Sequence, residues 1–180
     1  MDYTENKIRT INGYNGLIVK VDLDRISLPD GKEAFREVVR HPGGVSILAL
    51  DDEDNVVCVR QYRYCFGEHL LEIPAGKLEY GEDPYECAVR ELSEETGITA
   101  GKMVSLGEIY PSPGFCKEVL HLYLAMDLSY GEAHLDPGEF LDVIKVPFDE
   151  LLRQVMSGEI KDGKTVAAVL KTKIYLEENK

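Results

Sequence analysis

Three glutamates in one expected helix are the residues whose types and spacing point most clearly to chemistry. Glu91, Glu94 and Glu95 stand at i, i+3 and i+4, so their carboxylates share one helix face. Like charges at this spacing destabilise an isolated helix by roughly 0.2–0.5 kcal/mol each. Hard cations such as Mg²⁺ prefer carboxylate oxygen and are completed by water and substrate phosphates. The cluster therefore indicates a divalent-cation site or, as the alternative, a solvated acidic helix face.

The residues around this cluster favour the cation site. Glu82 precedes the helix and can reach the same cluster from its loop. Pro74-Ala75-Gly76 and Gly81 bracket a short loop in which the backbone can approach a ligand closely. Arg90 stands beside the first of the three glutamates, in a position to orient or balance the carboxylates.

Local signals define the helix that must carry these groups. Asp83-Pro84 predicts its start, because aspartate caps a helix and proline suits the first helical position. Gly97 is a natural stop. Tyr85, Val89 and Leu92 recur at i, i+4 and i+7, so we expect them to form its apolar stripe.

Strand signals flank the helix on both sides. The nearly continuous apolar run from Gly44 to Leu50 predicts a strand buried on both faces. Strands combined with helices predict a mixed sheet in an α/β or α+β sandwich. The other expected strands are 16–23, 33–40, 56–62, 104–110, 119–128 and 141–146, and the other expected helices are 148–157 and 165–177.

Length and composition exclude several classes of protein. The 180 residues fit a single domain, 1–180, and 33 acidic against 20 basic residues give a net charge of −13. A pI near 4.7 argues against binding to nucleic acid or to anionic membrane surfaces. The sequence has no transmembrane-length apolar run and begins with a polar segment, so we expect a cytoplasmic protein. The four cysteines show no zinc-binding spacing.

Residues 76–98 resemble the Nudix box. That motif is Gly, five residues, Glu, seven residues, Arg-Glu, an aliphatic residue, one residue, Glu-Glu, one residue, Gly and an aliphatic residue. Every fixed position is filled, and nine specified positions over 23 residues leave little room for a chance match. The nine residues are Gly76, Glu82, Arg90, Glu91, Leu92, Glu94, Glu95, Gly97 and Ile98.

The resemblance implies a fold and a reaction. The fold is a Nudix-type α/β/α sandwich with a mixed central sheet, preceded by N-terminal antiparallel strands. The reaction is hydrolysis, dependent on Mg²⁺ or Mn²⁺, of a nucleoside diphosphate linked to another moiety. The implied catalytic residues include Glu94 and Glu95, with Arg90 orienting the glutamates. The implied metal ligands are Glu82, Glu91, Glu94, Glu95 and the carbonyl of Ala75.

Segments outside the box are similar to the ADP-ribose pyrophosphatase subgroup. Pro113, 16 residues beyond the end of the motif helix, is one such feature, and the segments 36–39, 41–44, 60–63 and 71–76 are others. This likeness implies a homodimer that hydrolyses ADP-ribose to AMP and ribose 5-phosphate. The substrate-binding residues that it implies are Arg63 for a phosphate, Arg36 and Glu37 with Phe35 for the adenosine pocket, and Arg60, Pro113, Gly114 and Phe115. For Arg36 and Arg60 a surface ion pair is the alternative.

A catalytic base or additional metal ligand is expected in the acidic loop before the last strand. Glu139 is the candidate there. Pro137 and Gly138 stand where subgroup members often carry acids, so Asp136, Glu118 or a box glutamate are alternatives.

The resemblance extends over most of residues 10–160. Within the single domain, it implies N-terminal strands over about 1–42 that contribute to dimerisation, and a catalytic core over about 43–180. One alternative function is hydrolysis of another nucleotide sugar, a dinucleotide or an oxidised nucleotide. A non-catalytic ADP-ribose sensor is another, although such regulators often carry a degraded box. A plain acidic scaffold protein would leave the box unexplained.

Overall fold

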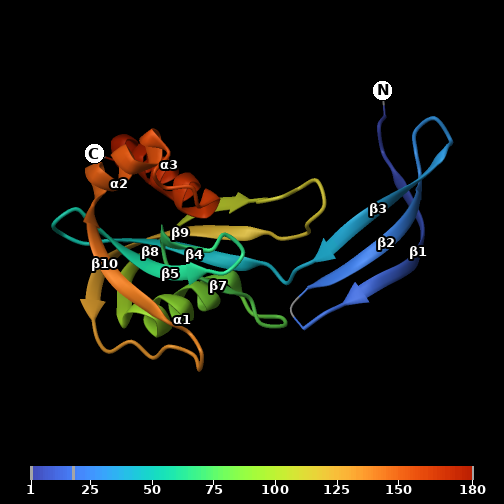
Figure 1. Cartoon of the computed structure of the whole chain (residues 1–180). Helices are drawn as coiled ribbons and strands as arrows, with labels where there is room; N and C mark the ends of the chain where they lie inside the picture. The colour runs from blue at the N-terminus through green and yellow to red at the C-terminus, as the bar shows by residue number, and fades with distance from the viewer. Residues whose placement is uncertain (1, 18, 180) are drawn as a thin grey trace. The chain divides into compact units, whose positions relative to one another are not determined.

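The computed structural model describes residues 2–17 and 19–179 and divides into two compact units. The smaller unit combines the chain before Gly44 with Tyr110–Val119. The larger unit combines Gly44–Ile109 with the chain after Val119. Figure 1 shows the elements of each unit. Within the described residues, no helix is long and apolar enough to cross a bilayer.

The smaller unit is an antiparallel sheet in the order β1-β2-β3. Its strands are β1 (Asn6–Asn15), β2 (Lys20–Ser27) and β3 (Glu33–Arg40). The bounds of β3 were predicted, and Gly31 supplies the positive φ of the preceding turn. The expected strand 16–23 is wrong at its start, because β2 begins at Lys20; Ile18 lies outside the described residues.

The larger unit contains a mixed sheet, which confirms the predicted sheet type. The path is β10-β5-β4-β9-β8, with β6 paired to β5 and β7 paired to β4. Only β4 and β9 run parallel among these pairs of described strands. The strands are β4 (Gly44–Leu50), β5 (Asn55–Arg63), β6 (Glu68–Glu72), β7 (Ala75–Lys77), β8 (Ile98–Ile109), β9 (Leu120–Tyr130) and β10 (Leu141–Pro147).

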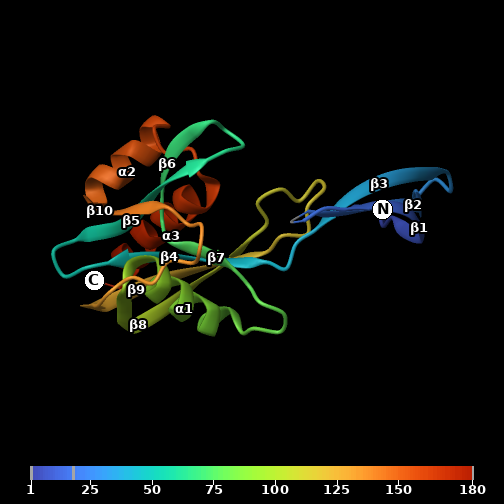
Figure 2. The same ribbon diagram turned by 60° about the horizontal axis from the view of Figure 1, so that its bottom comes forward.

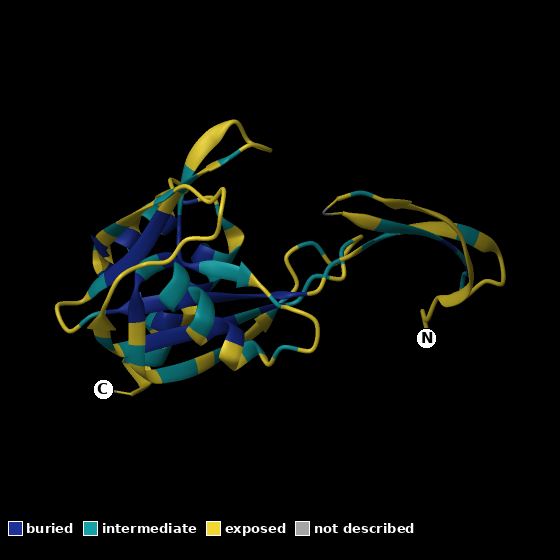
Figure 3. Ribbon diagram, turned by 90° about the horizontal axis from the view of Figure 1, so that it is seen from below, coloured by how far each residue is buried: buried dark blue, intermediate teal, exposed yellow. Residues whose placement is uncertain are grey.

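Helices cover both faces of this sheet (Figure 2), as the expected α/β/α sandwich requires. α1 (Pro84–Thr96) packs on one face, and α2 (Phe148–Ser157) and α3 (Gly163–Glu178) pack on the other. All seven residues of β4 are buried between the two layers (Figure 3), so the strand predicted to be buried on both faces is confirmed. Alternate β4 residues serve the two layers: Ile47 packs with Leu92 of α1, and Leu48 packs with Val169 of α3.

α1 has the predicted ends but a different buried face. Asp83 accepts hydrogen bonds from the backbone of the first turn, and Gly97 ends the helix in the left-handed conformation at φ 71°. The expected apolar stripe is wrong at Tyr85 and Val89, which are 51% and 40% exposed. The face that packs on the sheet carries Cys87, Ala88, Leu92 and Glu95. A glutamate thus occupies a position where the apolar pattern predicts a hydrophobic residue.

Candidate active site

Arg90 connects the loop before α1 to two glutamates on the helix. Its Nε and Nη2 lie 2.9 and 3.0 Å from the two carboxylate oxygens of Glu82. Its Nη1 donates to Glu91 and to Glu94, each at 2.9 Å. The hydrogen bonds from Arg90 lower the pKa of Glu82 to about 2. One guanidinium therefore holds three of the predicted metal ligands in place.

Glu95 points into the protein and touches the strand opposite. Its side chain is nearly buried, and its Oε2 accepts a hydrogen bond from the Ala75 backbone N–H at 3.1 Å. Burial raises the pKa of Glu95 to about 8, and the charges of Glu91 and Glu139 add to the effect. This contact brings the predicted ligands Ala75 and Glu95 together.

Gly76 leaves room for the carboxylate of Glu91. A Cβ on Gly76 would lie 1.8 Å from Glu91 Cδ and 2.0 and 2.2 Å from its two oxygens. No side chain fits there, which gives a physical reason for the first glycine of the box. Burial raises the pKa of Glu91, as do the charges of Glu94 and Glu139.

The loop that carries Glu139 is anchored to the end of α1. Gly131 N–H donates to Gly97 O at 2.7 Å, and His134 N–H donates to Glu94 O at 2.8 Å. A Cβ on Gly97 would lie 2.6 Å from Gly131 O, so the last glycine of the box permits this close approach. The charge of Glu139 adds to the raised pKa values of Glu91 and Glu95.

The two alternative bases have different surroundings. Asp136 lies in the Glu139 loop, and its carbonyl accepts from the Glu139 N–H at 3.0 Å. Glu118 belongs to the smaller unit, where its carboxylate is 3.6 Å from His41 Nδ1.

Each arginine predicted to bind substrate is paired with a carboxylate. Arg63 donates to both oxygens of Glu72, at 2.7 and 2.6 Å. Arg60 forms an exposed pair with Asp142 at 2.8 Å. In the smaller unit, the exposed Arg36 donates from Nε to Glu5 at 3.0 Å. Arg36 and Arg60 are therefore in the surface ion pairs that the sequence left as an alternative.

The segment with Pro113, Gly114 and Phe115 joins the strand that carries Arg36 and Glu37. Val39 N–H donates to Phe115 O at 2.7 Å, and Lys117 N–H donates to Val39 O at 3.0 Å. The structure thus groups these predicted substrate residues in the smaller unit. The box residues, Glu139, Arg60 and Arg63 are in the larger unit.

The chemistry of the glutamate cluster fits a hard divalent cation. Its donors are carboxylate oxygens, and repulsion between them contributes to the raised pKa values of Glu91 and Glu95. As placed, no three His, Cys, Asp or Glu side chains of the described residues are grouped closely enough to enclose a metal ion. Arg90 occupies oxygens of Glu82, Glu91 and Glu94 in this arrangement.

Sequence reasoning missed two charged residues next to the site. Glu72 is 1% exposed at the end of β6, and Lys164, near the start of α3, is 11% exposed and donates to its carboxylate. The available signal was a glutamate within the apolar run Leu70-Leu71-Glu72-Ile73. A charge in such a run is buried only with a partner.

Burial of Glu95 leads to a prediction for the metal-free protein. The melting temperature of the protein should fall as the pH rises from about 5 to about 8. Because the pKa of Glu95 is raised from 4.5 to about 8, the folded state keeps a proton that the unfolded chain releases. The resulting stabilisation is complete below the unfolded pKa and is lost as the pH passes the folded pKa. At about 1.4 kcal/mol for each pH unit between these two pKa values, the loss from pH 5 to pH 8 is roughly 3–4 kcal/mol, so we expect the melting temperature to fall by on the order of 10 °C.

Calorimetry in EDTA, on wild type and Glu95→Gln, measures this effect. The variant has no carboxyl at this position, so its melting temperature should fall less over the same pH range. Parallel curves for the two proteins would show that Glu95 does not titrate in this way.

Comparison with known proteins identifies the family of this chain. Residues 40–169 match the NUDIX domain family. The chain is 45% identical to the "Methanol dehydrogenase activator" of Bacillus methanolicus, over 93% of this chain and 91% of that protein. It is 42% identical to the "ADP-ribose pyrophosphatase" of Bacillus subtilis (strain 168), over 87% and 85%. A solved structure, "Crystal structure of ADP compounds hydrolase", has the same fold, with a TM-score of 0.84 at 19% identity over 99% and 96%. The resemblance of residues 76–98 is thereby confirmed, and the chain belongs to the Nudix family.

Proposed function

We propose that this chain hydrolyses the pyrophosphate of ADP-ribose, giving AMP and ribose 5-phosphate, with Mg²⁺ or Mn²⁺ as the required ion. The observation that carries the proposal is the grouping of the complete box. Glu91 lies against Gly76, Glu95 accepts from the Ala75 N–H, and the charge of Glu139 adds to the raised pKa of Glu95. The likeness to a Bacillus subtilis protein named ADP-ribose pyrophosphatase supports the choice of substrate.

The carboxylates have separate roles in this proposal. Glu91, Glu94 and Glu95 hold the cation, with support from Glu82 and the Ala75 carbonyl. Bound Mg²⁺ would neutralise pyrophosphate charge and lower the pKa of a water molecule. Arg90 orients the carboxylates through the hydrogen bonds described above.

Glu139 is the proposed base. It accepts the proton of the water that attacks phosphorus, and two backbone hydrogen bonds anchor its loop to the end of α1. Asp136 lies in the same loop and is the alternative for this role.

The remaining residues are proposed to bind the substrate. Arg63 exchanges its bond to Glu72 for a phosphate oxygen, for which a forked cation is suited. Arg60 assists with substrate charge. The proposed adenosine-binding residues in the smaller unit are Arg36, Glu37, Phe35, Pro113, Gly114 and Phe115.

We also propose that residues 1–42 form a dimerisation region and that residues 43–180 form the catalytic core of one functional domain. The sheet of the smaller unit exposes apolar side chains along its strands, including Ile8, Ile11, Tyr14 and Phe35. A three-stranded sheet needs a buried face for stability, and a second copy of the chain can supply the cover. Sedimentation should therefore give a dimer at micromolar concentration; a monomer with an intact sheet would contradict this.

Relative catalytic efficiency distinguishes the proposed substrate from others. Purified protein with Mg²⁺ should show kcat/KM for ADP-ribose at least about tenfold above that for another nucleotide sugar, a dinucleotide or an oxidised nucleotide. A higher value for one of these compounds would replace ADP-ribose as substrate. Binding of ADP-ribose without any product would instead support a sensor.

A further inference from the structure

A buried ion cluster joins the start of α3 to the end of β6. Glu72 accepts two hydrogen bonds from Arg63, and its Oε2 also accepts from the ammonium of Lys164. The side chain of Glu72 is buried and that of Lys164 is 11% exposed, whereas that of Arg63 is 39% exposed. One buried carboxylate therefore holds two cations, of which only the arginine has substantial access to solvent.

The neighbouring residue of α3 fixes the same stretch of backbone. Thr165 Oγ1 accepts from the Ile73 N–H at 3.0 Å and donates to Asp162 at 2.6 Å. Lys164 Nζ also lies 2.9 Å from Asp162. The first turn of α3 is thus bonded to residues 72 and 73, and the chain then continues through Pro74 to Ala75 in the candidate site.

The charges determine what happens when an anion attracts Arg63. If Glu72 had Arg63 as its partner and no other cation, a turn of the guanidinium toward phosphate would leave a buried carboxylate unpaired, which is strongly unfavourable. Lys164 can stay beside Glu72 when Arg63 turns away, because its side chain is only 11% exposed. The second cation therefore makes the exchange of partners by Arg63 easier.

We propose that Lys164 is a positioning residue for substrate binding: as the permanent counter-ion of Glu72, it frees Arg63 to bind a phosphate of the substrate. Lys164 acts through Glu72 and Arg63 and does not touch the substrate. The inference rests on the proposed function, in which the substrate carries a pyrophosphate.

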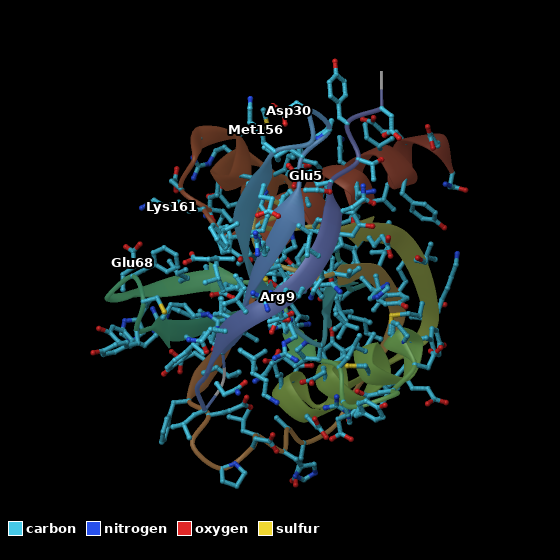
Figure 4. The ribbon with its side chains drawn as sticks, turned by 90° about the vertical axis from the view of Figure 1, so that its right-hand side faces the viewer. Glu5, Arg9, Asp30, Glu68, Met156 and Lys161 are labelled. Atoms are coloured by element: carbon cyan, nitrogen blue, oxygen red, sulfur yellow. The ribbon has the colours of Figure 1, made fainter. Side chains whose placement is uncertain are left out.

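Substitution of Lys164 tests this role against a matched control. Lys164→Gln removes the charge, Lys164→Arg keeps it, and Lys161→Gln removes a nearby exposed charge. Lys161 Nζ lies 3.8 Å from Glu68, and both residues are labelled in Figure 4. With ADP-ribose and Mg²⁺, we expect Lys164→Gln to raise KM about tenfold with kcat changed less than about threefold. Lys164→Arg should recover most of the affinity, and Lys161→Gln should behave as wild type.

A double-mutant cycle separates positioning from a structural role. Glu72→Gln releases Arg63, so adding Lys164→Gln to it should change KM by no more than about twofold. This double variant carries no buried unpaired glutamate, and melting temperatures check that each protein is folded. The inference would be overturned if Lys164→Gln raised KM equally in wild type and in Glu72→Gln. It would also be overturned if Lys164→Gln left KM unchanged or lowered kcat alone.

Calorimetry on the four proteins of the cycle measures the dissociation constant for ADP-ribose. This measurement tests the role of Lys164 separately from the proposed hydrolysis. A wild type that binds but does not hydrolyse ADP-ribose, with the same coupling in the dissociation constant, would refute the hydrolase and support the role of Lys164. Absence of binding and of hydrolysis in wild type would overturn both.

Discussion

Glu95→Gln should lower kcat for ADP-ribose by roughly 100- to 10,000-fold without lowering the melting temperature at pH 8. The amide keeps the shape of the side chain and can still accept from the Ala75 N–H. It cannot supply the charged oxygen that the proposed cation needs. Because burial already disfavours the charged form of Glu95, a neutral side chain should be tolerated there.

Steady-state release of AMP and thermal unfolding, measured on the same samples, check the two parts of this prediction. Glu86→Gln is a suitable control, because Glu86 is an exposed carboxylate in the first turn of the same helix. The control should keep wild-type turnover. If Glu95→Gln retained it as well, Glu95 could not be an essential metal ligand.

Gly76→Ala should reduce turnover by roughly 100-fold, through displacement of Glu91. The new methyl group would lie 1.8 Å from Glu91 Cδ, so the carboxylate would have to leave its present position. Overcrowding of this kind also costs about 1–3 kcal/mol, which should appear as a lower melting temperature.

Gly163→Ala is the matched control for this substitution. A Cβ on Gly163, the first residue of α3, would meet no atom within 4 Å, and the position has no positive φ. Its kinetics should equal those of wild type, with stability unchanged or slightly higher. Equal activity of Gly76→Ala and Gly163→Ala would show that the close approach of Glu91 to Gly76 has no part in the reaction.

The sequence predicted well those elements whose signals are local and strong. The apolar run of β4, the cap and stop of α1, and the bounds of α2 agree with the structure. β1 escaped prediction because all ten of its residues are exposed, so it lacks the alternation of a half-buried strand. β8 begins at Ile98, whereas the expected strand began at Val104. The sequence did not predict the first half of this strand, because Gly101 and Lys102 weaken its apolar pattern.

Some residues of the candidate site could likewise be predicted from the sequence, and others could not. The box is contiguous, so its helix spacing alone placed Glu91, Glu94 and Glu95 on one face. The ion pair between Lys164 and Glu72 joins residues 92 positions apart, and only the packing of α3 against the sheet brings them together. The sequence also did not predict that Glu95 points into the protein, because the apolar residues Tyr85 and Val89 suggested another buried face of α1.

Product analysis with ADP-ribose and purified wild-type protein tests the central claim most directly. The reaction should yield AMP and ribose 5-phosphate in equal amounts with Mg²⁺, and EDTA should stop it until Mg²⁺ is restored. The absence of AMP with either Mg²⁺ or Mn²⁺, or the same rate in EDTA, would contradict metal-dependent hydrolysis of the pyrophosphate.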